Sequence, residues 1–175
     1  ARHNNAFGTG QYEVFKKINE LKEYEVTFFL SDKNIYFTGV NNEYIKENNL
    51  QNNIFLRGFL EHKKLLNSFC DYDLFISHPI EMDHIAEAFF MANMEAMSSG
   101  LPIITTDCGG VPFVVKDNAI VCNQMSIEDI VKSIEKLLTD KILFNKMSVN
   151  GRKYIEDNFS HELIVKKWRE VFDEK

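Results

Sequence analysis

Hydrophobic and polar positions along the chain follow two alternating periods. Short apolar or β-branched runs are typical of strands, and the stretches between them carry an apolar residue at every third or fourth position, which is typical of helices. The expected strands span residues 24–30, 34–40, 53–58, 72–78, 102–106 and 118–123. The expected helices span residues 11–21, 42–50, 61–69, 88–99, 126–139, 141–157 and 160–173. This alternation predicts an α/β fold, a Rossmann-like doubly wound parallel sheet flanked by helices.

Several helix boundaries carry their own signals. Gly100 follows the helix expected at residues 88–99, and Pro102 lies just beyond it, a pair that is typical of a helix end. Ser126 and Ser160 stand at the start of two later expected helices, where a side-chain hydroxyl can cap free backbone N–H groups.

Composition indicates one globular domain over residues 1–175, since 45% of residues are hydrophobic and only 3 are proline. The last helices, from about residue 141 to 175, are expected to pack back on that domain, with Trp168 on the packed side. The chain opens on Ala1 and not on methionine, and we interpret it as a piece of a longer protein.

Charge and cysteine content narrow the function classes. A net charge of -6 argues against a nucleic-acid partner, because phosphate neutralisation requires clustered basic residues. The 3 cysteines show no metal-binding spacing and no disulfide framework, which favours a reducing compartment and predicts no metal site. No apolar run reaches the roughly 18 residues of a membrane span.

Open parallel sheets bind ligands beyond the carboxyl ends of their strands. Three such exits are candidates: Gly58 with Phe59, the loop at residues 78–87, and the turn at residues 107–110. The middle loop leads straight into a helix whose first N–H groups could face an anion. Those first amides belong to Ala88, Phe89 and Phe90.

Glu87 and Glu95 lie eight positions apart around this helix. At about 100° per residue they differ by roughly 80°, so both can border one crevice at different depths. Carboxylates accept strong hydrogen bonds from hydroxyls, and amides at a helix start suit phosphate, so the arrangement fits a phosphorylated, sugar-like ligand. The alternative is that Glu87 is an ordinary first-turn acid favoured by the helix dipole and that Glu95 is solvent-exposed. Spacing alone does not separate the two.

Other reactive side chains favour ordinary roles. His78 and His84 flank the candidate loop, where a single histidine is more often a surface residue. His62 lies near a helix start, where capping or exposure is expected. Cys108 has no base or basic cluster nearby in the sequence and is expected to be a small buried residue.

Two stretches, "FLRGFLEHKKLLNSFCDYDLFISHP" and "EAFFMANMEAMSSGLPIITTDCGGVPFVV", together resemble the C-terminal, donor-binding domain of retaining GT-B glycosyltransferases of family 4. The resemblance covers about residues 53–115. Its specific element is an ordered combination: Glu, seven residues, Glu-Ala-Met, then Gly-Leu-Pro, a strand and Gly-Gly.

The resemblance implies a role for each charged residue. Glu95 would hold the ribose hydroxyls of a nucleotide, and Glu87 would contact the transferred sugar near the reacting centre. Arg2 would neutralise the leaving diphosphate, a stabilisation that the family achieves without a metal. The implied ligand is a nucleotide-sugar donor, a UDP- or GDP-sugar, with no further cofactor.

Backbone contacts are implied as well, from the sugar and diphosphate to the amides of Ala88, Phe89 and Phe90. Gly58 and Phe59 match the family's turn beside the base. The chain also departs from the family pattern: Ala6 or Phe7 stands where a lysine is usual, and Phe113 stands where a glutamate is common.

The chain is thereby identified as half of an enzyme that transfers a sugar with retention of anomeric configuration, in polysaccharide or glycoconjugate synthesis. An acceptor sugar or glycolipid would bind through an N-terminal domain outside this chain, so the piece alone is expected to be inactive. The resemblance places the full-length enzyme in the cytoplasm, with peripheral association at the inner face of the membrane. Two alternatives stay open: half of a nucleotide-sugar epimerase, and a non-catalytic GT-B-like scaffold domain.

Overall fold

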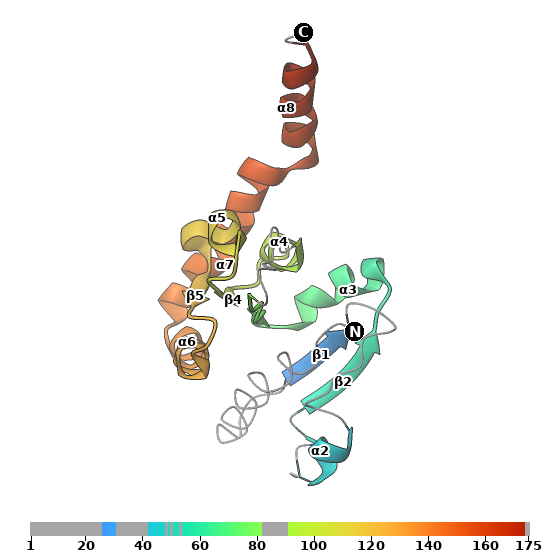
Figure 1. Ribbon diagram of the computed structural model, residues 1–175, viewed down its shortest axis with the longest axis vertical. Coiled ribbons are helices and arrows are strands. Elements are labelled where there is room, and N and C mark those ends of the chain that lie inside the picture. The colour runs from blue at the N-terminus through green and yellow to red at the C-terminus, as the bar shows by residue number, and fades with distance from the viewer. Residues whose placement is uncertain are drawn as a thin grey trace.

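Five parallel strands and seven helices make up the described part of the chain (Figure 1). The computed structural model describes residues 26–30, 42–47, 49, 51–52, 54–81 and 91–173. The strands are β1 (Val26–Leu30), β2 (Ile54–Phe59), β3 (Phe75–Ile76), β4 (Ile103–Thr106) and β5 (Ile120–Cys122). The helices are α2 (Asn42–Glu47), α3 (His62–Ser68), α4 (Met91–Ser98), α5 (Val111–Val115), α6 (Ile127–Thr139), α7 (Lys141–Phe159) and α8 (His161–Asp173), with 3₁₀ turns η1 (Phe69–Asp71) and η2 (Lys116–Asn118). The predicted helix at 11–21 and strand at 34–40 lie outside the described residues.

The described strands form two parallel ladders. β1 pairs with β2, and β3, β4 and β5 pair in that order. In the first ladder Phe28 pairs with Leu56 and Phe29 with Gly58, so Arg57 is skipped as a bulge. Strand β2 therefore continues through Gly58 to Phe59, whereas the sequence predicts that the strand closes at Gly58.

Helices cover both faces of the three-stranded sheet, which confirms the doubly wound α/β fold. Adjacent residues of β4 point to opposite sides, because strand side chains alternate. Ile103 packs into a core with α4 and α5, and Ile104 packs into a second core with α6. Figure 1 shows α6 on one side of β4 and β5 and α4 and α5 on the other. All four residues of β4 are buried, as expected of a central parallel strand.

The end of α4 is set by Gly100, as the sequence predicts. Gly100 has a φ of 83°, and its N–H donates to the Met97 carbonyl at 2.9 Å. The next N–H, of Leu101, donates to the Ala96 carbonyl at 3.1 Å. This pair of bonds is a Schellman motif, which requires a left-handed residue at Gly100 and turns the buried Leu101 back toward the core.

We expect Gly100→Ala to lower the free energy of unfolding by about 1 to 2 kcal/mol, because a side chain disfavours the left-handed backbone. The space itself is adequate, since an added Cβ would lie 3.6 Å from Ser148 Oγ. Gly151→Ala in α7 is the matched control: its added Cβ would meet Met97 Cε at an ordinary 3.7 Å. Urea titration should find this second variant unchanged or more stable by up to about 1 kcal/mol. Equal losses in both variants would contradict a backbone origin.

The predicted caps are partly confirmed. Ser126 accepts the Asp129 N–H and caps α6. Helix α7 begins with a cap that the sequence reading missed: the Asp140 carboxylate accepts from the N–H groups of Ile142 and Leu143. At Ser160, before α8, the backbone carbonyl accepts the Ile164 N–H.

The two C-terminal helices pack differently. Helix α7 buries Met147, Gly151 and Ile155. Helix α8 has no buried residue in the described part of the chain, and Trp168 is 56% exposed where the sequence predicts a packed side chain. Trp168 is exposed because α8 contacts α7 and extends away from the sheet, so its side chains do not reach the core (Figure 1). None of the described helices combines the length and apolar character that crossing a membrane requires.

Candidate functional site

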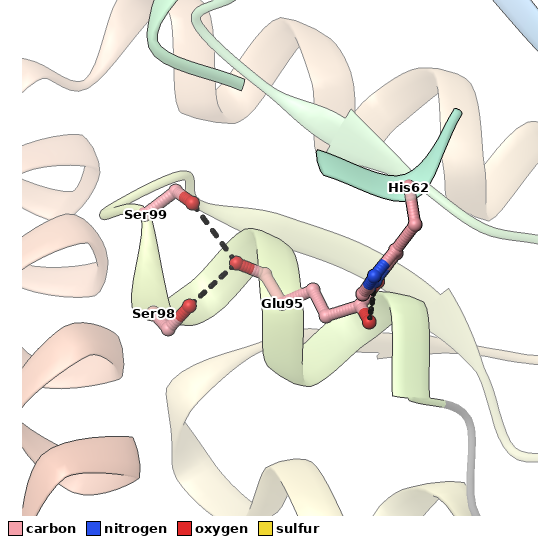
Figure 2. Close-up of polar contacts among 4 residues, drawn as sticks. All are labelled: His62, Glu95, Ser98 and Ser99. Atoms are coloured by element: carbon pink, nitrogen blue, oxygen red, sulfur yellow. Dashed lines mark hydrogen bonds and ion pairs between the residues drawn. The ribbon is translucent and has the colours of Figure 1, made fainter. Parts of the chain in front are cut away.

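Glu95 lies in the middle of α4 on the side that faces α3. Its neighbours on both sides are buried, including Met94 and Ala96, whereas the Glu95 side chain retains 21% of its exposure. Its Oε1 accepts a hydrogen bond from His62 Nε2 at 2.8 Å (Figure 2). Glu95 is thus neither a core residue nor a freely solvated one, and among the described residues its carboxylate is hydrogen-bonded to His62.

The turn after Glu95 is held to its backbone. The hydroxyls of Ser98 and Ser99 donate to the Glu95 carbonyl at 2.7 and 3.0 Å (Figure 2). These bonds add to the backbone bond that the same carbonyl accepts from the Ser99 N–H at 3.2 Å. They fix the backbone from which the Glu95 side chain projects.

A buried polar cluster anchors α4 to the sheet two residues before Glu95. Asn93 Oδ1 lies 2.7 Å from Ser77 Oγ, Asn93 Nδ2 lies 3.2 Å from Thr105 Oγ1, and the two hydroxyl oxygens are 2.9 Å apart. All three side chains are buried. Each hydroxyl has one proton, so the three bonds can close a ring in which every member donates once and accepts once. Because the polar groups satisfy one another, the ring fixes the position and rotation of α4.

His78 lies two residues after the end of β3 and is buried, not on the surface as the sequence predicts. Its Nε2 donates to the Gln124 carbonyl at 2.8 Å, which gives the ring a partner inside the protein. Burial lowers the pKa of His78 below its ordinary value of 6.5, against a smaller raising effect of this hydrogen bond. The imidazole is therefore neutral near pH 7, with its proton on Nε2.

Gln124 joins the loops that follow all three strands of the second sheet. Its backbone N–H donates to Asp107 Oδ1 at 3.0 Å, and its side-chain Nε2 donates to the Asp107 carbonyl at 3.2 Å. Its Oε1 accepts the Glu81 N–H at 2.6 Å, and its carbonyl accepts from His78. The Thr106 hydroxyl adds a bond to the Pro79 carbonyl. Sequence reasoning missed Gln124; the one signal for it is its place just after the strand expected at residues 118–123.

Stability is expected to fall as the pH drops below about 6.5, because the unfolded chain then binds a proton that the folded His78 resists. The loss grows as the pH falls toward the lowered folded pKa of His78 and levels off below it. His78→Gln keeps a donor near the Nε2 position and should flatten this part of the profile. Thermal melts between pH 7.5 and 5 measure the effect. His161→Ala, at the exposed start of α8, is the control and should retain the wild-type slope.

The remaining predicted site residues divide into two groups. Gly58 and Phe59 are the last two residues of β2, at the carboxyl end of that strand. The others lie outside the described residues: Arg2, Glu87, Ala88, Phe89 and Phe90. Cys108 is buried, as predicted. Within the ranges that the structure describes, no group of three or more His, Cys, Asp or Glu side chains could hold a metal ion.

A cavity of about 280 Å³ lies away from Glu95, between α6, α7 and the start of β5. Lys132, Lys136 and Lys146 line it together with apolar side chains such as Leu143. Lys132 is paired with Glu128 at 3.0 Å. The cavity opens at the amino end of β5, opposite to the edge at which parallel sheets bind ligands, so we do not assign it to the site.

Sequence relatives are glycosyltransferases. The chain is 30% identical over 154 residues to poly(glycerol-phosphate) alpha-glucosyltransferase of Bacillus subtilis, a match that covers 86% of this chain and 21% of that protein. It is 33% identical over 89 residues to a component of human phosphatidylinositol N-acetylglucosaminyltransferase, covering 51% of this chain and 17% of the relative. The chain thus spans about a fifth of the length of these curated relatives.

Solved structures share the fold. A glycosyltransferase from Rickettsia africae superposes with a TM-score of 0.78 at 23% identity, covering 94% of this chain and 43% of that one. The C-terminal domain of the group 1 glycosyltransferase LpcC from Francisella tularensis superposes with a TM-score of 0.68 at 20% identity, covering 86% of this chain and 79% of that one. Anabaena Alr3699/HepE in complex with UDP-glucose superposes with a TM-score of 0.63 at 16% identity, covering 98% of this chain and 55% of that one. These likenesses confirm a Rossmann-like α/β domain of the kind found in GT-B glycosyltransferases.

The family assignment follows from the sequence itself. The profile of glycosyl transferases group 1 matches residues 10–154, which is most of the chain and includes Glu95 and the segments around it. The chain belongs to the family of glycosyl transferases group 1.

Proposed function

We propose that the chain is the donor-binding half of a retaining glycosyltransferase of family 4, whose ligand is a nucleotide-sugar. The observation that carries the proposal is the placement of Glu95: a partly open carboxylate on a helix anchored by a buried polar ring, in a chain of this family. Binding costs less when the binding group projects from a rigid element, and the ring around Asn93 fixes the helix that carries Glu95.

The Glu95 carboxylate suits a ribose diol. Each carboxylate oxygen can accept two hydrogen bonds, so Oε1 can accept from His62 and still accept from a ligand hydroxyl. Two neighbouring hydroxyls can then donate to the two oxygens, one to each. Hydrogen bonds to a charged acceptor are about twice as strong as neutral ones. A ribose is a better ligand for this group than a phosphate, which the negative charge repels.

The remaining roles follow the family resemblance. We assign Glu87 to the transferred sugar near the reacting centre and Arg2 to the leaving diphosphate. The amides of Ala88, Phe89 and Phe90 would approach the sugar and diphosphate, and Gly58 and Phe59 would lie beside the base. Charge on the departing phosphate oxygens would be stabilised by Arg2 and backbone dipoles, so the proposal requires no metal and no further cofactor.

UDP is the first nucleotide to test. Two neighbours in fold support it by their ligands: HepE was solved with UDP-glucose, and TarM with alpha-GlcNAc-glycerol and UDP. A GDP-sugar is the second candidate donor. The solved C-terminal domain of LpcC, most of which this chain covers, supports the assignment to a C-terminal half.

The acceptor would bind outside this chain, in an N-terminal half. The names of the relatives, a poly(glycerol-phosphate) glucosyltransferase and a phosphatidylinositol glycosyltransferase component, support an acceptor sugar or glycolipid in polysaccharide or glycoconjugate synthesis. For the full-length enzyme we propose a cytoplasmic location with peripheral association at the inner face of the membrane. The present chain alone should bind donor and not transfer sugar.

A thermal-shift panel with UDP, GDP, ADP, CDP and dTDP tests the proposal. A ligand present at 100 times its Kd stabilises a fold by about 2.7 kcal/mol, so millimolar nucleotide reveals even a weak site. We expect one nucleotide to raise the melting temperature clearly above the others. No shift with any of the five would contradict donor binding by this chain.

A non-catalytic scaffold domain is the second candidate. The observation that favours it is Phe113 in α5, which is 82% exposed where the family resemblance leads one to expect a glutamate. An exposed aromatic ring suits protein contact better than solvent. Retention of Glu95 in an anchored position favours the donor-binding function, and the nucleotide panel separates the two.

A further inference from the structure

We infer that His62 is a positioning residue for nucleotide binding, which fixes the Glu95 carboxylate in the orientation that receives the ribose. The inference rests on the proposed function and adds to it a residue that the sequence reading assigned to capping or solvent exposure. It stands on the hydrogen bond of 2.8 Å between His62 Nε2 and Glu95 Oε1 (Figure 2).

The His62–Glu95 pair differs from the other ion pairs between described residues. The other pairs join residues three or four positions apart and have side chains that are more than half exposed. His62 and Glu95 are 33 positions apart and connect the start of α3 with the middle of α4. Pairs at short spacing support their own helix, whereas this one fixes a side chain across two elements.

His62 is well placed for this role along the chain. It is the first residue of α3 and lies three positions after Phe59, which ends β2. The bond therefore connects the carboxyl end of β2, where the resemblance places the base, with α4, which carries Glu95, the residue proposed to bind the ribose. Base and ribose are adjacent parts of one nucleoside. The His62–Glu95 bond therefore holds their two proposed binding groups, the end of β2 and Glu95, close to each other.

The chemistry of the bond fixes its direction. An ionised carboxylate only accepts, so His62 Nε2 must carry the proton, whether the imidazole is neutral or charged. A free glutamate side chain samples many rotamers, and fixing it when a ligand binds costs conformational entropy. With Oε1 held by His62, much of that ordering is complete before the ligand arrives.

The His62 side chain is 68% exposed, so its removal leaves no cavity and should change stability little. An effect of His62 on ligand affinity is therefore separable from an effect on folding. A glutamine at this position would carry an amide nitrogen near the place of Nε2, so His62→Gln preserves the donor and His62→Ala removes it.

Isothermal titration of the full chain with UDP, or with the nucleotide selected by the thermal-shift panel, tests the inference. We expect His62→Ala to raise the Kd between about twofold and tenfold, the size of one ordinary hydrogen bond. His62→Gln should restore affinity to near the wild-type value. His161→Ala, another exposed histidine at the first position of a helix, is the matched control and should not change the Kd. In a Glu95→Ala background, His62→Ala should have no further effect.

The outcomes separate this inference from the proposed function. If the wild type binds, Glu95→Ala weakens binding and His62→Ala leaves the Kd unchanged, the positioning role is wrong and the proposed function stands. Tighter binding by His62→Ala would also overturn it, because His62 would then compete with the ligand for Glu95. If the wild type binds none of the five nucleoside diphosphates, both conclusions fail.

Discussion

Asn93→Asp is expected to lower the free energy of unfolding at pH 7 by about 3 to 4 kcal/mol, because it places a carboxylate among fully buried groups. Asn93 has no exposed surface, and its Nδ2 donates to Thr105 Oγ1 at 3.2 Å. An aspartate that stays ionised lacks the amide donor to Thr105 and loses the hydration of its charge on burial. An aspartate that is protonated in the folded state must have a raised pKa. The deficit should therefore shrink as the pH is lowered from 7 toward 4, where the buried acid is protonated.

Asn145→Asp, on an exposed turn of α7, is the matched control for the Asn93 variant. It makes the same chemical change in solvent and should alter stability by less than about 0.5 kcal/mol. Urea titrations at pH 7 and pH 5 measure both variants. A loss below about 1 kcal/mol for Asn93→Asp at pH 7 would show that the buried ring does not anchor α4.

Glu95→Ala is expected to raise the Kd for the bound nucleoside diphosphate by roughly tenfold to a hundredfold, the range for losing hydrogen bonds to a charged group. Glu95→Gln should lose almost as much, since its neutral amide accepts at one atom only. Without ligand both variants should melt near the wild type, because the side chain is partly exposed and its one side-chain partner among described residues is His62.

Glu135→Ala controls for the charge change, since Glu135 is an exposed acid on α6. Its Kd should equal that of the wild type. Isothermal titration with all four proteins decides the matter: equal affinity of Glu95→Ala and wild type would remove Glu95 from the binding site.

Much of the fold could be predicted from the sequence because its signals are local. The apolar run at residues 102–106 became the buried strand β4, and Gly100 ended α4 in a left-handed conformation. The helices predicted from residue 126 onward agree with α6, α7 and α8 to within two residues. Helix α5 was missed, because the five residues Val111–Val115 are too short and too apolar to show a helical period.

The candidate site was less predictable, because its contacts join residues far apart in the sequence. Glu95 could be selected from the family resemblance, but its partner His62 is 33 positions away and carries no motif. His78 was expected on the surface, since a loop histidine in sequence gives no sign that Gln124, 46 positions later, offers a carbonyl inside the protein. The buried ring likewise joins residues that are far apart in the sequence: Asn93 in α4, Thr105 in β4 and Ser77 just after β3. Burial and partners of polar groups are tertiary properties, and periodicity does not encode them.

Discrimination between a ribonucleoside diphosphate and its 2′,3′-dideoxy analogue is the most direct test of donor binding through Glu95. Both ligands carry the same base and diphosphate, so only the hydroxyls that Glu95 is proposed to hold differ between them. We predict that wild type binds the ribonucleotide at least about tenfold more tightly and that Glu95→Ala shows no preference. Equal affinity of the wild type for the two ligands, or no binding of either, would contradict the proposed function.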